Sequence, residues 1–169
     1  IGEGHRAGAA QQADLAHLVA EQGLGHGGHG VDMHERGVAL LAFHAHGGLI
    51  TLTRGGELFL SRPLNVGLEM LQRTDHQTGY FDQVVLEVQR SMDYYESHFR
   101  EAPLRNVALA PLPYDIPGFA DYLGANLNTH IIAVDLARLM DCGSELSPSL
   151  QAACFATIGA ALRQEMKAL

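Results

Sequence analysis

The sequence predicts an α/β domain with a mixed sheet, in which a β-meander is followed by alternating helices and strands. Two runs of alternating polarity flank the dipeptide Gly55–Gly56, and residues 81–99 repeat apolar side chains with a helical period. Further along, short apolar runs alternate with helical segments. A chain of 169 residues with 47% hydrophobic residues can bury one domain core of ordinary size.

The N-terminal part is predicted to differ from the rest of the chain. Residues 1–30 are expected to be a flexible piece, ahead of a domain over residues 31–169. Within this piece, residues 11–22 predict a short helix. Residues 23–30, GLGHGGHG, predict a loop because five glycines would lose much conformational freedom on folding. The chain starts with Ile rather than Met, so we expect it to be part of a longer protein.

The meander consists of three predicted strands, Val38–Phe43, Leu49–Thr53 and Glu57–Arg62. The first is a continuous apolar run, which is typical of a buried central strand. Gly55–Gly56 between the second and third predicts a tight hairpin turn, since glycine accepts the positive φ that such turns require. Alternation in the third strand places Leu58 and Leu60 on one face and Phe59 on the other.

The segment 81–99 predicts a long amphipathic helix. Its apolar residues are spaced by 4, 3, 4, 3 and 4, which puts them on one face: Phe81, Val85, Val88, Met92, Tyr95 and Phe99. Charged residues between them are expected to face water: Asp82, Glu87, Arg90, Asp93 and Glu96. One face of this helix should therefore lie in the core.

The remaining elements complete an alternating pattern. They are a possible helix at 67–73, a strand at 107–110, a loop at 111–117, a helix at 118–127, a strand at 131–134 and a helix at 149–165. The later strands are expected to join the sheet in parallel through right-handed crossovers. This is the ribonuclease H-like pattern, the building block of the actin-like ATPase fold.

Composition excludes several classes of function. The net charge of −8 and the scattered positions of eleven Lys and Arg argue against a nucleic-acid partner. No apolar run approaches the roughly 20 residues of a membrane-spanning helix, so no direct membrane insertion is expected. The two cysteines, Cys142 and Cys154, form no disulfide framework or paired metal motif, which favours a cytoplasmic location.

Histidine offers one candidate for metal chemistry. Five of the ten histidines lie at His26, His29, His34, His44 and His46. The last two form an HxH pair on or after a strand, where residues two apart share a face and could meet one metal ion. Glycines surround the first pair and no carboxylate completes a known ligand spacing, so a solvated loop with surface histidines is favoured. The sequence therefore assigns no metal-binding residue.

The turn in AFHAHGGLITL is a candidate phosphate loop. In actin-like ATPases the corresponding turn is rich in small residues and follows an acidic residue that supports the metal ion. Gly47 and Gly48 could approach a phosphate, but Ala42, Phe43 and His44 replace the acidic residue. Without a magnesium ligand, phosphoryl transfer would lose its main charge stabilisation. We therefore assign no catalytic or cofactor-binding residue and expect no cofactor.

The loop PLPYDIPGF after the strand at 107–110 occupies the place of the adenosine-binding turn of such proteins. That turn contains paired glycines, whereas prolines and Tyr114 stand here. A rigid structural loop is the favoured interpretation.

Three segments together resemble the PilM-like family of type IV pilus assembly. They are LLAFHAHGGLITLTRGGELFLSRPLNVG, VVLEVQRSMDYYESHF and NVALAPLPYDIPGFADYLGANLNTHIIAVDL. The family's helix after the meander reads like EIQRSLDYY, and CFATIGAALR is similar to its closing helix. The resemblance covers roughly residues 31–165. The absence of both nucleotide-binding features is most like the PilM-like member of the mannose-sensitive haemagglutinin (MSHA) pilus system.

The resemblance implies an actin-like ATPase fold and a function without enzymatic turnover. PilM-like proteins are cytoplasmic scaffolds, peripheral to the inner membrane, that bind a short cytoplasmic segment of inner-membrane pilus assembly proteins (PilN-like). We expect this role here. The alternative is a nucleotide-binding actin-like ATPase or a sugar-kinase-like enzyme of the same fold.

Overall fold

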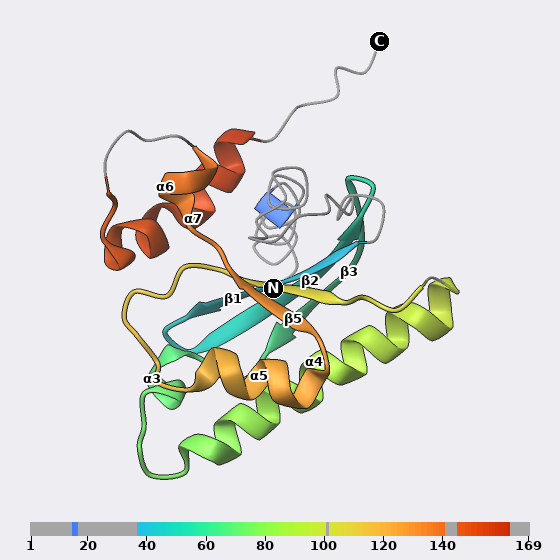
Figure 1. Cartoon of the computed structure of the whole chain (residues 1–169), viewed down its shortest axis with the longest axis horizontal. Helices are drawn as coiled ribbons and strands as arrows, with labels where there is room; N and C mark the ends of the chain where they lie inside the picture. Colours follow the sequence, from blue (N-terminus) through green and yellow to red (C-terminus); the bar gives the residue numbers. More distant parts are fainter. Residues whose placement is uncertain (1–14, 17–36, 101, 141–144, 163–169) are drawn as a thin grey trace.

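The computed structural model describes residues 15–16, 37–100, 102–140 and 145–162 (Figure 1). The strands are β1 (Val38–His44), β2 (Gly47–Arg54), β3 (Glu57–Leu64), β4 (Asn106–Leu109) and β5 (His130–Ala133). The helices are α3 (Leu68–Leu71), α4 (Gln77–Phe99), α5 (Phe119–Leu127), α6 (Leu136–Leu139) and α7 (Pro148–Leu162). In this part of the chain, no helix is both long and apolar enough to cross a membrane.

All five strands form one mixed sheet in the order β3-β2-β1-β4-β5. The meander strands pair antiparallel, whereas β1 with β4 and β4 with β5 pair parallel. The predicted meander, the alternating second half and the parallel addition of the later strands are confirmed. The predicted central strand is β1, which has two strands on either side.

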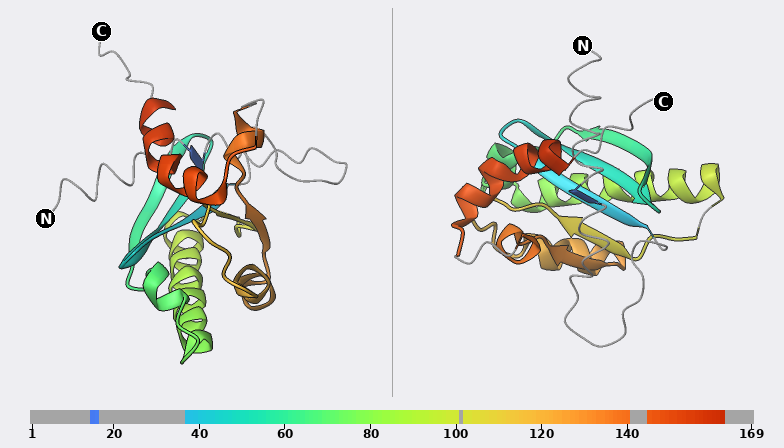
Figure 2. Two further views of the ribbon diagram at one scale, coloured as in Figure 1. Left: turned by 90° about the vertical axis from the view of Figure 1, so that its left-hand side faces the viewer. Right: turned by 90° about the horizontal axis from the view of Figure 1, so that it is seen from above.

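Helices cover both faces of this sheet (Figures 1 and 2). The long helix α4 and α5 lie on one face, and α6 and α7 lie on the other. Successive β1 residues point to opposite faces, so Ala39 and Leu41 join the α4 and α5 core, while Val38 and Leu40 join the second core. Both sets are buried, which explains why β1 is a continuous apolar run.

The predicted apolar face of α4 is confirmed and is wider than expected. Five of its six predicted residues are buried, and Phe99 is half-buried against the same core. Val84 and Ser91 are buried as well. Ser91 meets the cost of burying a hydroxyl by donating a hydrogen bond to the Glu87 carbonyl oxygen at 2.7 Å. The polar residue is therefore accommodated inside the apolar stripe.

The predicted faces of β3 are wrong, because the strand contains a bulge. Leu60 pairs with Leu52, but Thr53 pairs with Leu58, so Phe59 is an extra residue between them. One extra residue reverses the alternation of side chains beyond it. Phe59 and Leu60 therefore both pack on the α4 side, and Leu58 is 41% exposed.

The N-terminal predictions fall mainly outside the described residues, as do the glycine-rich loop and residues 163–165 of the last predicted helix. Leu15 and Ala16 are described, are helical and are fully buried in the core beneath α6 and α7. The hairpin between β2 and β3 is as predicted, since Gly55 and Gly56 have φ of +57° and +79°.

Candidate functional site

The carboxyl ends of the parallel strands β1, β4 and β5 form the candidate site, since open α/β sheets place ligands at this edge. A pocket of about 360 Å³ lies beside the ends of β4 and β5. Apolar side chains of Leu112, Ile116 and Phe119 contribute to its wall. Tyr114 and Asp115 line it as polar groups, and both come from the loop that follows β4.

The two glycines of the candidate phosphate loop have a packing explanation. Gly47 and Gly48 are the first residues of β2 and pair with His44 and Phe43 in the antiparallel ladder. A Cβ on Gly48 would lie 2.9 Å from both the Ala42 carbonyl oxygen and the ring of Phe43. Glycine is therefore needed here by the sheet itself, whether or not a phosphate binds.

The backbone at Gly67 lies against the turn between β1 and β2. A Cβ on Gly67 would lie 2.3 Å from the Gly47 amide nitrogen and 2.4 Å from the Ala45 carbonyl oxygen. The amide of Glu69 donates a hydrogen bond of 3.1 Å to that same carbonyl oxygen. The backbone before α3 thus packs directly on the turn, on the side of the Gly47 amide.

Gly67→Ala is expected to destabilise the fold at the upper end of the about 1–3 kcal/mol typical of overpacking. Residue 67 has φ −115° and ψ 177°, which any residue adopts, so the cost comes from the collision with backbone atoms. Denaturant unfolding of both proteins measures it. The matched control is Gly79→Ala in α4, where nothing lies within 4 Å and about 0.4–1 kcal/mol of stabilisation is expected. Equal effects at the two glycines would contradict the close contact.

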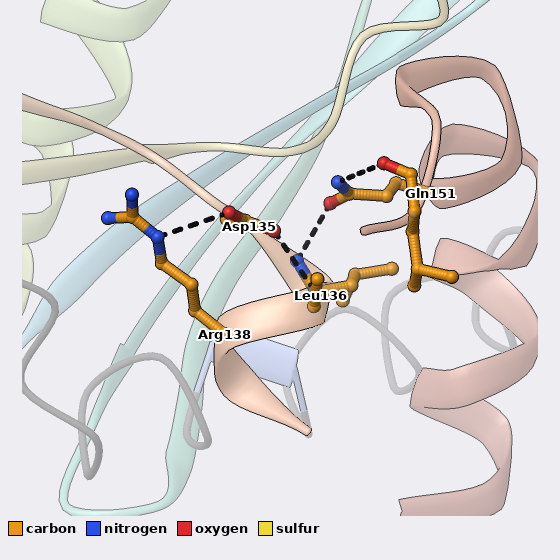
Figure 3. A network of polar contacts seen from close by, with 6 residues as sticks. Asp135, Leu136, Arg138 and Gln151 are labelled. Atoms are coloured by element: carbon orange, nitrogen blue, oxygen red, sulfur yellow. Dashed lines mark hydrogen bonds and ion pairs between the residues drawn. The ribbon is translucent and has the colours of Figure 1, made fainter. Parts of the chain in front are cut away.

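A polar network joins β5, α6 and α7 at the other side of the pocket (Figure 3). Asp135 follows β5 and accepts a hydrogen bond of 3.0 Å from the Ala137 amide, which makes it the N-cap of α6. Its second oxygen lies 3.3 Å from Arg138 Nε. The side chain of Gln151 in α7 accepts a hydrogen bond of 2.8 Å from the Leu136 amide and donates one to the Leu146 carbonyl oxygen.

Several backbone donors at this edge are therefore already used by the chain. Besides the two amides at the start of α6, the Phe119 amide donates to the Ile116 carbonyl oxygen and the Leu150 amide to Ser147 Oγ. Four prolines near the pocket have no N–H: Pro111, Pro113, Pro117 and Pro148. Phosphate binding by backbone needs free amides that converge on one point. The four amides named above are therefore not available to a phosphate at this edge.

Tyr114 lines the pocket and is affected by the charge of Glu69 in α3. Burial raises the pKa of the Tyr114 hydroxyl, and the charge of Glu69 raises it further. Glu69 Oε2 in turn lies 3.4 Å from His46 Nδ1, with both side chains well exposed. Tyr114 is therefore a neutral hydrogen-bonding group at ordinary pH.

The histidine candidates are only partly described. His44 ends β1 and His46 lies in the turn that follows, so the pair lies across the end of the strand. His26, His29 and His34 lie outside the described residues. Within the described ranges, no group of three or more His, Cys, Asp or Glu side chains could hold a metal ion.

Sequence reasoning singled out Tyr114 but missed two other polar groups beside the pocket, Asp135 and Gln151. Asp135 carried a usable signal, because Asp directly after a predicted strand is a typical N-cap of a following helix. Nothing in the sequence marks Gln151 as the partner of an amide fifteen positions earlier.

Comparison with solved structures identifies the fold. The chain is similar to one in the PilM–PilN type IV pilus biogenesis complex, with a TM-score of 0.60 and 16% identity over 89% of this chain and 50% of that one. Apo pSK41 ParM matches with a TM-score of 0.45 and 9% identity, over 88% of this chain and 48% of that one. A Bacteroides thetaiotaomicron protein with actin-like ATPase fold and unknown function matches with a TM-score of 0.45 and 8% identity. The match covers 75% of this chain and 40% of that one.

No protein-family model matches the sequence, and no curated protein matches it either. The chain spans about half the length of the first two of these structures, and less of the third. The sheet order and the likeness to the PilM–PilN structure together show that this chain has the ribonuclease H-like, actin-like ATPase fold.

Proposed function

We propose that this chain belongs to a type IV pilus assembly protein that works as a scaffold and holds a PilN-like inner-membrane partner. The single observation that carries the proposal is the likeness to the PilM–PilN type IV pilus biogenesis complex over 89% of the chain. The amino-acid sequences of α4 and of the region from β4 to α5 resemble the same family.

A role without catalysis is supported by the chemistry of the carboxyl edge. The position that would support a metal ion beside the turn has Ala42, Phe43 and His44 in place of a carboxylate. The backbone around Gly47 is covered by Gly67, and prolines replace the paired glycines after β4. Binding and charge stabilisation of a nucleotide both lack their usual groups.

The finer proposal is that the protein acts in biogenesis of the MSHA pilus, as MshI. Its support is the combined loss of the acidic residue and of the paired glycines. We place the protein in the cytoplasm, peripheral to the inner membrane through its partners.

Co-purification tests this proposal. The protein is co-expressed at full length with a PilN-like protein from the same organism, and a tag on one is used to isolate both. We expect the two to elute together, and we expect deletion of the gene to remove surface pili. Normal pili in the deletion strain would refute the assembly role.

The rival function is a nucleotide-binding ATPase or sugar-kinase-like enzyme, and the actin-like ATPase fold favours it. Thermal stability in the presence of ATP and Mg²⁺ distinguishes the two functions. An enzyme of this kind should be stabilised by ATP with Mg²⁺, whereas the scaffold should not.

A further inference from the structure

We infer that the outer edge of β3 pairs with the β3 edge of a second copy of this chain, antiparallel and about a two-fold axis. In this register Glu57 of each copy lies opposite Arg62 of the other, and Leu58 lies opposite Ser61. The two sheets then join into one continuous sheet. The inference goes beyond the proposed function and does not depend on it.

The outer edge of β3 is open in the part of the chain that the structure describes. β3 ends the sheet order β3-β2-β1-β4-β5, so one side of its backbone pairs with β2 and the other side pairs with no described strand. β3 has eight residues, whereas β5 at the opposite edge has four. A long edge is a template for pairing, and a very short one offers few backbone groups to another chain. β3 is therefore the edge better able to bind a further strand.

The bulge at Phe59 places Glu57 and Arg62 on the same face of the sheet. In a regular strand, residues five positions apart point to opposite faces. Here Phe59 is an extra residue, and the alternation reverses beyond it. The β2 partners of the two charged residues are Arg54 and Ile50, which are four positions apart and so share a face. Ile50 belongs to the α4 core, so both charged residues lie on the α4 side.

The pleat of the strand selects the register. A two-fold axis perpendicular to the sheet keeps each face of one copy continuous with the same face of the other, so opposed residues must share a face. Glu57 opposite Arg62 meets this condition. Leu58 opposite Ser61 meets it too, because their partners on β2 are two positions apart. A shift by one residue would oppose Glu57 to Ser61, and these two lie on opposite faces.

Charge complementarity favours the same register. Neither Glu57 nor Arg62 forms an ion pair with another described residue. In the dimer each Glu57 carboxylate meets an Arg62 guanidinium, and opposite charges that directly face each other stabilise paired strands. The Arg62 guanidinium carbon already lies 6.0 Å from the centroid of the Tyr94 ring, which limits the freedom it loses on pairing. The pairing also shields part of Leu58, which is 41% exposed.

Two features of β3 bear on the extent of the pairing. Pro63 has no N–H to donate and directly follows residues 57–62, so the pairing ends before it. A bulge can also keep an edge strand from pairing with another chain. The bulge at Phe59 lies at the centre of the inferred interface, and the two experiments that follow decide between its effects.

Sedimentation equilibrium of the full chain over a range of concentrations tests the dimer, and we expect a monomer–dimer equilibrium. Glu57→Arg alone and Arg62→Glu alone each place like charges opposite each other and should weaken the dimer by about tenfold. The double exchange Glu57→Arg/Arg62→Glu restores opposite charges and should restore the dimer. Glu145→Arg, an equal charge change at an exposed residue before α7, is the control and should leave the dimer unchanged.

Disulfide cross-linking tests the register, in a chain whose Cys142 and Cys154 are replaced by Ser. A mixture of Leu58→Cys and Ser61→Cys chains should form a linked dimer on oxidation. Opposed residues of antiparallel strands have Cα atoms about 4.5–5.5 Å apart, which is within disulfide range. Neither chain alone should cross-link, because equal positions on the two copies are offset by roughly 7–10 Å along the strands.

A wild-type chain that stays monomeric at every concentration would overturn the inference. A double exchange that dimerises no better than the single variants would do the same, as would cross-linking of Leu58→Cys with itself as readily as with Ser61→Cys. These measurements concern self-association alone. The assembly role is decided separately, by the co-purification and the gene deletion described above.

Discussion

Tyr95→Ala is expected to lower the free energy of unfolding by about 3–5 kcal/mol, the range found when a large buried aromatic is truncated. Tyr95 is 0% exposed on α4. Its ring packs edge-on against Phe59, with 5.4 Å between the ring centroids, and lies 5.9 Å from the ring centroid of Phe99. Phe59 and Phe99 also meet each other at 5.2 Å, so loss of the central ring leaves a cavity and two broken aromatic contacts. Urea unfolding followed by circular dichroism measures the change.

Tyr95→Phe should behave in the opposite way. In the described structure the buried hydroxyl of Tyr95 has no hydrogen-bond partner, and burial raises its pKa. Removing an unsatisfied buried hydroxyl while keeping the ring should be neutral or stabilising, by up to about 1–3 kcal/mol. Tyr94→Ala, at a neighbouring residue that is 40% exposed, is the control and should cost far less than Tyr95→Ala. A loss in Tyr95→Phe as large as in Tyr95→Ala would show that the hydroxyl is bonded.

Met92→Ala is expected to destabilise the fold by about 2–5 kcal/mol, because Met92 is only 7% exposed and belongs to the α4 core. Asp93→Ala, at the next position on the exposed side, should stay within about 0.5 kcal/mol. Chemical denaturation of the two variants gives both numbers. A cost below about 0.5 kcal/mol for Met92→Ala would mean that this face of α4 is a partner surface and not core.

Elements with a regular period could be predicted from the sequence. The 3.6-residue repeat of α4 and the continuous apolar run of β1 each report burial directly. The apolar residues recur where side chains face the core, on one face of α4 and on both faces of β1. Gly55–Gly56 marked its hairpin for a similar reason, since the turn needs two positive φ angles. These local features fix the order of elements, and the order limits the sheet to few topologies.

Features that depend on contacts between distant segments could not be predicted. The bulge at Phe59 shifts the register against β2, and no residue type in ELFLSR announces it. Gly67 was predicted only as the first residue of a possible helix, and nothing in the sequence shows that the turn at Ala45 lies against it. The one-turn helix α6 was missed because four residues are too few for a period, and its start is held by Gln151 from α7.

The candidate site follows the same division. The absence of an acidic residue before Gly47 and of paired glycines after β4 was readable from the sequence. The pocket between Leu112 and Phe119, with Asp115 at its edge, exists only once β4, β5 and α5 are assembled. The actin-like fold is thus kept, while the amides at the start of α6 are already used by Asp135 and Gln151 of the same chain.

The most direct test of this account is the melting temperature of the full protein during titration with ATP, with and without Mg²⁺. The account predicts no saturable shift at any ATP concentration. A saturable, Mg²⁺-dependent rise would contradict it, since a ligand at 100 times its Kd adds about 2.7 kcal/mol to the stability of the folded state.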